Sequence, residues 1–233
     1  MTMLEKNKEY GKRFKDLLKL RHEPVAVRVI RENEKYNIPL AEKQLSHCQA
    51  VDAAKTGKVF MMSADLHGCN VGASALGIVE TPEKVGSGEF HFMIGAHKTQ
   101  AATEKMISER TVMPSKTVGT LYAPLSKADF EPDVVIIEDI PERVYWFMAM
   151  STFEKGGRAT FSTAPFQAMC VDAFTVPMKT KQPNISIGCF GCRKRTDIKP
   201  DEMIIGVPYE MVPKMNKILD TYKDGILTKA KRD

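Results

Sequence analysis

Five cysteines are the residues of this chain whose types and spacing could do chemistry: Cys48, Cys69, Cys170, Cys189 and Cys192. All five lie at expected turns or element ends rather than inside apolar runs. Cys69 and Cys189 each follow a glycine, a residue that lets the backbone wrap a thiolate and point its amides at the sulfur. This pattern predicts ligands for a soft metal or an iron–sulfur cluster.

The cysteines also follow an internal repeat. In the first half, a strand that begins at a proline precedes Cys48, and a second strand precedes Cys69. The second half has the same order with Cys170 and Cys189. Two copies of one supersecondary unit, related by a pseudo-twofold axis, would bring these four thiols to one centre. The alternative is a chance similarity between short motifs.

Four thiolates bind either a structural zinc ion or an iron–sulfur cluster. Zinc sites are typically built from two close cysteine pairs, but here only Cys189 and Cys192 form such a pair. The dispersed set therefore favours one [4Fe–4S] cluster bound by Cys48, Cys69, Cys170 and Cys189. Zinc and cysteines that are merely small buried residues remain open alternatives. A redox dithiol made by Cys189 and Cys192 is another.

Other candidate residues lie beside these ligands. Arg193 opens a basic run, residues 193–195, that would stabilise an anionic cluster or bind an anionic substrate, unless the run is only a solvated loop. His47 and His67 neighbour predicted ligands and could tune or replace one of them, although histidines are more often simply hydrogen-bonded. Cys192 has no counterpart in the first half, which predicts a place beside the cluster rather than a ligand.

The elements that must position these residues alternate between helices and strands. Strands are expected at residues 25–30, 59–62, 90–94, 118–122, 133–138, 158–161, 184–187 and 202–207. Helices are expected at residues 4–20, 42–55, 72–77, 99–110, 141–150 and 208–227. The pattern predicts an α/β or α+β fold with two similar strand-helix halves in one compact unit. A helix in residues 1–22 would precede a first half, 23–125, and a second half, 126–233.

Composition limits the class of protein. A chain of 233 residues that is 43% hydrophobic can bury a proper core. The net charge of +5 comes with no recognition motif, which argues against nucleic acid as a partner. No stretch approaches the roughly 20 apolar residues of a membrane span, so we expect no membrane and a cytoplasmic protein. In a reducing cytosol, five cysteines persist as thiols or ligands rather than as a disulfide framework.

Several motifs together resemble a known family. They lie at residues 48–57, 69–77, 123–125, 131–135 and 187–193. Over roughly residues 15 to 220 the chain resembles the DUF169 family, an uncharacterised group in archaea and bacteria. The resemblance implies a recurring cysteine set at Cys48, Cys69, Cys170 and Cys189. It also implies that Gly191 and Arg193 follow the last of these, whereas Cys192 stands where the family more often has another residue. It implies no activity.

The sequence thus predicts an iron–sulfur protein that holds one [4Fe–4S] cluster between two halves, for electron transfer or redox chemistry on a small molecule. Its partner would be an unidentified redox protein or an anionic small molecule. The alternative is a regulatory module that binds zinc or no metal and takes up a small ligand. Whether the protein is an enzyme, and whether it forms a homo-oligomer, does not follow from the sequence.

Overall fold

The fold is built on one six-stranded sheet. The computed structural model describes residues 1–114 and 116–230. The strands are β1 (Val25–Arg31), β2 (Phe60–Ser63), β3 (Thr117–Pro124), β4 (Val134–Asp139), β5 (Asn184–Ser186) and β6 (Met203–Pro208). Their order is β2-β3-β1-β4-β6-β5, and every neighbouring pair is antiparallel. The predicted mixture of helices and strands is confirmed, in its α+β form because the described strands of the sheet pair antiparallel.

Helices cover both faces of the sheet. The longer ones are α1 (Met3–Leu18), α2 (His47–Lys55), α6 (Gln100–Ser108), α7 (Pro141–Thr152) and α10 (Val212–Lys223). The shorter ones are α3 (Asn70–Ala75), α4 (Glu83–Gly86), α5 (Glu89–Met93), α8 (Val176–Thr180), α9 (Phe190–Arg195) and α11 (Ile226–Lys229), with a π-helix, η3 (Ala168–Thr175). Short 3₁₀ turns occur at Ala64–Leu66, Leu125–Lys127 and Tyr209–Met211. None of the helices in the described residues is long and apolar enough to cross a membrane.

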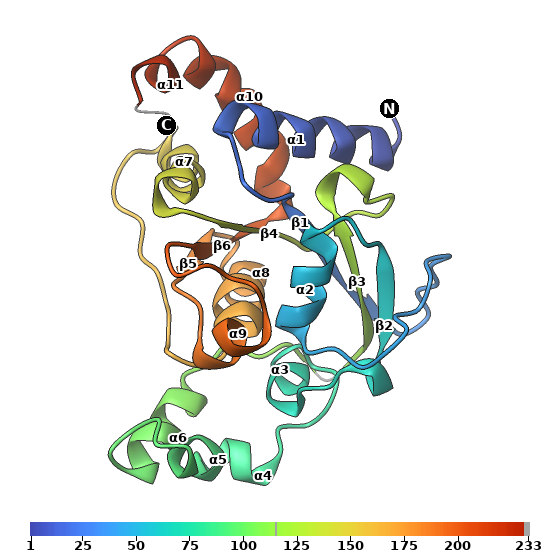
Figure 1. The fold of residues 1–233 in the computed structure, drawn as a ribbon, viewed down its shortest axis with the longest axis vertical. Helices are drawn as coiled ribbons and strands as arrows, with labels where there is room; N and C mark the ends of the chain where they lie inside the picture. Colours follow the sequence, from blue (N-terminus) through green and yellow to red (C-terminus); the bar gives the residue numbers. More distant parts are fainter. Residues whose placement is uncertain (115, 231–233) are drawn as a thin grey trace.

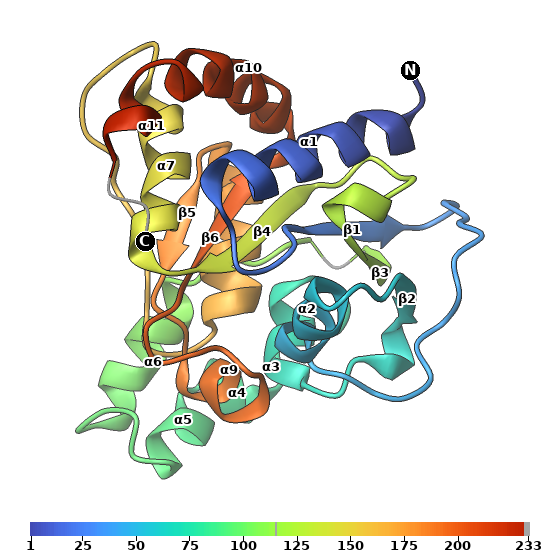
Figure 2. The ribbon, with the colours of Figure 1, turned by 45° about the horizontal axis from the view of Figure 1, so that its top comes forward.

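The helices form a layer on each side of the sheet. Helices α1, α7 and α10 lie on one side, and α2, α3, α8 and α9 lie on the other (Figures 1 and 2). Helices α4, α5 and α6 gather at the end of the molecule farthest from α1 and α10 (Figure 1). The result is a three-layer arrangement with the sheet in the middle.

Burial on both faces explains why the central strands are mostly apolar. On one face, Ala26 of β1 joins a core with Phe14 and Phe147, whose rings meet edge to face at 5.0 Å. On the other face, Val27 of the same strand joins a core that contains Cys48. Each fully buried large apolar side chain contributes about 1.5–3 kcal/mol to stability. One of the two cores therefore lies directly under the cysteines.

The strand order reads the same from both edges if β1, β2 and β3 correspond to β4, β5 and β6. In each half, one cysteine lies in a helix between the first two strands, Cys48 in α2 and Cys170 in η3. The other caps the N-terminus of a six-residue helix, Cys69 at α3 and Cys189 at α9. This is the order that two related units would produce, with α4–α6 as an addition to the first half.

Two of the predicted strands are wrong. Residues 90–93 form most of helix α5 and Ile94 caps its end, because Gly88 begins the helix with a φ of +75° and no described strand of the sheet runs beside it. Residues 158–161 are irregular and mostly exposed. The segment after them is held by Asn184, whose side chain bonds both the amide and the carbonyl of Ser162 and replaces a strand ladder.

Helix boundaries also differ from expectation. The helix expected at 42–55 begins only at His47, because Ser46 caps it through the amide of Gln49. The closing helix expected at 208–227 is divided into a 3₁₀ turn, α10 and α11, with a break at Asp224 and Gly225. Residues 193–195, considered above as a loop, form the end of helix α9.

Candidate metal centre

All five cysteines line one cavity of about 310 Å³. They reach it from four separate segments: α2, the start of α3, the π-helix η3 and the start of α9. Cys69 is half-buried and the other four are buried. The structure therefore brings together every cysteine that the sequence singled out, including the fifth.

Cys48 enters the cavity at the start of α2. Ser46 caps this helix and its hydroxyl also lies 3.1 Å from the Cys48 sulfur. A hydrogen bond with Cys192, with help from Ser46, lowers the pKa of the Cys48 thiol to about 7. The residue that begins the helix thus also favours a thiolate at its first turn.

Cys189 and Cys192 form the tightest pair of thiols. Their Sγ atoms lie 3.3 Å apart, and the backbone N–H of Cys192 donates to the Cys189 sulfur at 3.4 Å. The hydrogen bond with Cys192 is the main cause that lowers the pKa of Cys189 to about 5. The same contact raises the pKa of Cys192, which is left as the protonated partner.

Cys69 and Cys170 meet over Gly72. A Cβ at Gly72 would stand 3.8 Å from the Cys170 sulfur and 4.0 Å from that of Cys69, so the two thiols share the space above this glycine. Burial raises the pKa of Cys170, and negative charge on Cys189, Cys69 and Cys48 raises it further. These four thiols are therefore close enough to repel one another as anions, and a bound cation would relieve that repulsion.

Single-ion geometry is absent among the thiols. In the described residues, no three cysteine sulfurs lie within 4.8 Å of one another. Two groups of other side chains meet that criterion: His22 with Glu138 and Glu202, and Asp52 with Glu138 and Asp197. The buried amine of Lys55 forms ion pairs with all three carboxylates of the second group, and Arg21 with Glu202 of the first. Basic side chains of the protein thus already form ion pairs with both acidic groups.

The two predicted histidines lie differently. His47 lines the cavity, with Nδ1 2.8 Å from the hydroxyl of Tyr122. His67 does not line it, and its Nε2 lies 3.0 Å from the hydroxyl of Thr120. Burial lowers the pKa of His47 to about 3, assisted by His67, and that of His67 to about 4. Both imidazoles are therefore neutral near pH 7.

Arg193 is not placed to bind an anion in the cavity. It does not line the cavity, and its guanidinium donates to the backbone carbonyls of Ile187, Lys199 and Glu202. Lys194 and Arg195 line the cavity instead. Successive residues of a helix point about 100° apart, so a basic run on α9 cannot present all its charges to one side. Arg193 therefore holds backbone carbonyls, whereas Lys194 and Arg195 lie beside the thiols, and anion binding by Arg193 stays a prediction.

The sequence reasoning missed the residues that close the cavity. Phe90 of α5, Ile94 directly after α5 and Phe190 of α9 line it and remain largely exposed. His91 lines it as well and is buried. The apolar residues at 90–94 have the composition of a strand, and no local signal places the helix that they form beside the cysteines. Arg110 is a further cation that interacts electrostatically with Cys170. No sequence signal indicated this residue.

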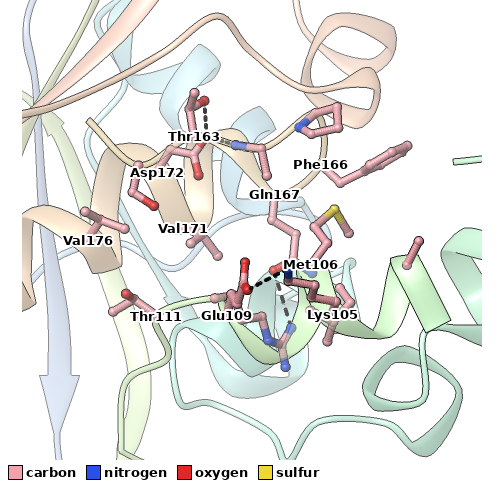
Figure 3. A pocket seen from close by; sticks show the side chains of 16 residues that line it. Lys105, Met106, Glu109, Thr111, Thr163, Phe166, Gln167, Val171, Asp172 and Val176 are labelled. Carbon is pink, nitrogen blue, oxygen red and sulfur yellow. Dashed lines mark hydrogen bonds and ion pairs between the residues drawn. The ribbon is translucent and has the colours of Figure 1, made fainter. Parts of the chain in front are cut away.

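A second cavity, of about 320 Å³, lies behind the same wall. Phe166 and Gln167 line both cavities, and Gln167 adopts a left-handed conformation with a φ of +65°. Figure 3 shows Asp172 in this second cavity, bonded to the hydroxyl of Thr163 at 2.8 Å. Burial raises the pKa of Asp172 to about 7. A carboxyl group that can change charge near neutrality therefore stands two residues after Cys170.

Comparison with known proteins finds similarity over most of the chain. It is 26% identical over 220 residues to an uncharacterized protein from Methanocaldococcus jannaschii, a match that covers 93% of this chain and 94% of that protein. No solved structure matches it. Residues 13–217 match the family DUF169, which is described as "Uncharacterised ArCR". Because this match spans most of the sequence, the chain belongs to the DUF169 family.

Proposed function

We propose that this protein holds one [4Fe–4S] cluster through Cys48, Cys69, Cys170 and Cys189. The observation that carries the proposal is that four separate segments deliver all the cysteines of the chain to one cavity. Buried thiols that only pack as small hydrophobic residues have no reason to gather in this way. The cluster would serve electron transfer or redox chemistry on a small molecule.

The arrangement favours a cluster over a single zinc ion. Zinc draws four ligands into one tetrahedron, and no three of the described thiols lie within 4.8 Å of one another. A cluster of four irons spreads its cysteines more widely, because each thiolate binds a different iron. The low pKa of Cys189 and of Cys48 supports thiolate ligation at both of these positions.

The surroundings fit a site with net negative charge. Lys194 and Arg195 line the cavity, and Arg110 lies near Cys170 without an ion-pair partner among the described residues. These cations would offset the thiolate charge or attract an anionic redox partner. Phe90 and Phe190 would limit the access of water to the thiols. A bound cluster supplies one-electron chemistry, and these side chains control what reaches it.

Analysis of the metal tests this proposal. Protein purified without oxygen should contain iron and acid-labile sulfide at about four of each per chain. It should be brown and lose its colour in air or with a chelator. Zinc at one per chain without sulfide would contradict the cluster and support the alternative of a zinc-binding module.

Substitution of single cysteines tests the ligand set. Cys170→Ser and Cys48→Ser should lose most of the iron and lower the unfolding temperature, because metal binding is coupled to folding. Cys192→Ala is the matched control and should retain iron near the wild-type level, since this residue is proposed to lie beside the cluster. Full iron in Cys170→Ser, or complete loss in Cys192→Ala with retention in Cys189→Ala, would show that the ligands are wrongly assigned.

The alternative function is a metal-free module that binds a small ligand. The apolar entrance to the cavity, formed by Phe90, Ile94 and Phe190, is the observation that favours it. Two observations would support this alternative. Anaerobically purified protein would contain neither iron nor zinc, and its unfolding temperature would be the same with and without added iron and sulfide.

A further inference from the structure

The thiols of Cys189 and Cys192 lie close enough to form a disulfide with a small movement of the sulfur atoms. The Sγ atoms of Cys189 and Cys192 are 3.3 Å apart, and a disulfide requires about 2.05 Å. Both residues belong to the first turn around α9, where Cys189 is the N-cap and Cys192 is inside the helix. Closing the bond therefore needs a sulfur movement of roughly 1 Å within one turn, without displacement of a distant segment.

The cavity gives a small oxidant a path to this pair. Cys189 and Cys192 are 7% and 3% exposed, and both line the cavity. The amide of Cys192 donates to the Cys189 sulfur, which orients that sulfur toward its partner. Cys48 is the competitor, because its thiol also bonds to Cys192. It enters from α2, however, so a link to it would join two separate elements.

We propose that Cys189 and Cys192 form a reversible oxidative modification site, in which a peroxide converts the two thiols into a disulfide when no metal is bound. The Cys189 sulfur attacks one peroxide oxygen, the O–O bond breaks, and the leaving hydroxide takes a proton to become water. The Cys192 sulfur then attacks the resulting sulfenic acid. The S–S bond forms, the S–O bond breaks, and the oxygen leaves as a second water with the proton of Cys192.

The balance is complete with hydrogen peroxide as the oxidant. The two thiols lose two electrons and two protons, and one peroxide is reduced to two waters. A small dithiol reverses the step by exchange. If the proposed cluster exists, the disulfide removes Cys189 from its ligands and prevents reloading until it is reduced. The disulfide itself does not require the cluster.

Peptide mapping of the full-length chain tests the disulfide directly. The protein is reduced, freed of metal with a chelator, treated with one equivalent of hydrogen peroxide without oxygen, alkylated and digested with trypsin. Residues 182–193 form one tryptic peptide that contains both cysteines. We expect this peptide to be two hydrogens lighter and protected from alkylation, and two of the five thiols to be lost. A cross-link between this peptide and the one with Cys48, or free alkylation of Cys192, would overturn the proposal.

Variants separate this site from the proposed cluster. Cys192→Ser should stop at the sulfenic acid of Cys189, which dimedone traps, whereas the control Cys69→Ser should still form the disulfide. Equal dimedone labelling of Cys189 in Cys192→Ser and in the wild type would contradict Cys192 as the resolving thiol. The iron content of untreated protein is measured in parallel. Failure of the disulfide proposal can then be distinguished from failure of the cluster proposal. If Cys192→Ser does not fold, the wild-type peptide map decides alone.

Discussion

At the scale of single residues, a basic side chain that is adjacent to a cysteine in sequence need not point into the cavity. Arg193 follows the last cysteine pair, but its guanidinium holds three backbone carbonyls together. Lys194, one residue later, lines the cavity and lies with its amine 5.7 Å from the ring centre of Phe190. The difference comes from helical geometry, which sends successive side chains in different directions.

The residue-scale prediction concerns this division. Arg193→Ala should lower the free energy of unfolding by about 1–2 kcal/mol, because carbonyls of Ile187, Lys199 and Glu202 lose a charged donor. Lys194→Ala is the control and should change stability by less than about 0.5 kcal/mol. Urea unfolding of both variants measures the difference. Equal stability of the two variants would show that Arg193 is only a solvated surface residue.

At the scale of elements, the π-helix η3 depends on a glycine in the strand beneath it. A Cβ at Gly206 of β6 would lie 1.9 Å from the backbone oxygen of Ala173 in η3. Only glycine allows the strand and the π-helix to approach so closely. Cys170 lies in the same π-helix, so the contact under Ala173 positions a proposed ligand on the opposite side of the sheet from α10. π-Helical segments often occur at functional sites.

The prediction at this scale is that Gly206→Ala displaces η3. The clash is with backbone, so we expect a loss of about 1–3 kcal/mol in the free energy of unfolding, with less metal retained because Cys170 moves. Gly86→Ala is the control, since the nearest side-chain atom to its added Cβ is 3.6 Å away. Urea unfolding and iron analysis read the two effects. Wild-type stability and metal content in Gly206→Ala would rule out this contact as a determinant of the site.

At the scale of the whole molecule, an ionic cluster joins the start of the chain to its last strand. Glu202, before β6, is buried and accepts hydrogen bonds from the amide of Lys199 and from His22 and Arg21, which precede β1. Burial alone would raise the pKa of this carboxyl, but the three donors overcome it and lower the pKa below the usual 4.5. The ionised form of Glu202 is therefore the one that the folded state prefers.

The corresponding prediction is a loss of stability in acid. Because the folded pKa of Glu202 lies below the unfolded value, its contribution is present above about pH 4.5 and disappears as the pH falls through the folded pKa. Glu202→Gln should be less stable than the wild type at neutral pH, and the difference should shrink below about pH 4.5. Glu210→Gln, at an exposed glutamate, is the control. A difference for Glu202→Gln that is constant from acid to neutral pH would contradict this account.

Much of the fold and of the candidate site followed from the sequence. The apolar runs at β1, β3, β4 and β6 can be recognised from the local sequence, because a strand buried on both faces is mostly apolar. Ser46 and the capping of α2 act within four residues. The repeat of the cysteines in the two halves could be recognised from the sequence without knowledge of the three-dimensional fold. For these reasons composition and local pattern located most elements and named all five cysteines of the cavity.

The tertiary structure decided which elements meet. Residues 90–94 have the composition of a strand, but residues 90–93 lie in helix α5, which Gly88 begins and which pairs with no strand of the sheet. The approach of Phe90, Arg110 and Gln167 to the cysteines depends on chain segments far apart in sequence. Local periodicity sets secondary structure through neighbouring residues, whereas the membership of a cavity is set by strand order and helix packing across the whole chain. The sequence alone therefore determined the chemistry available to this protein, and only the packed fold determined which residues surround it.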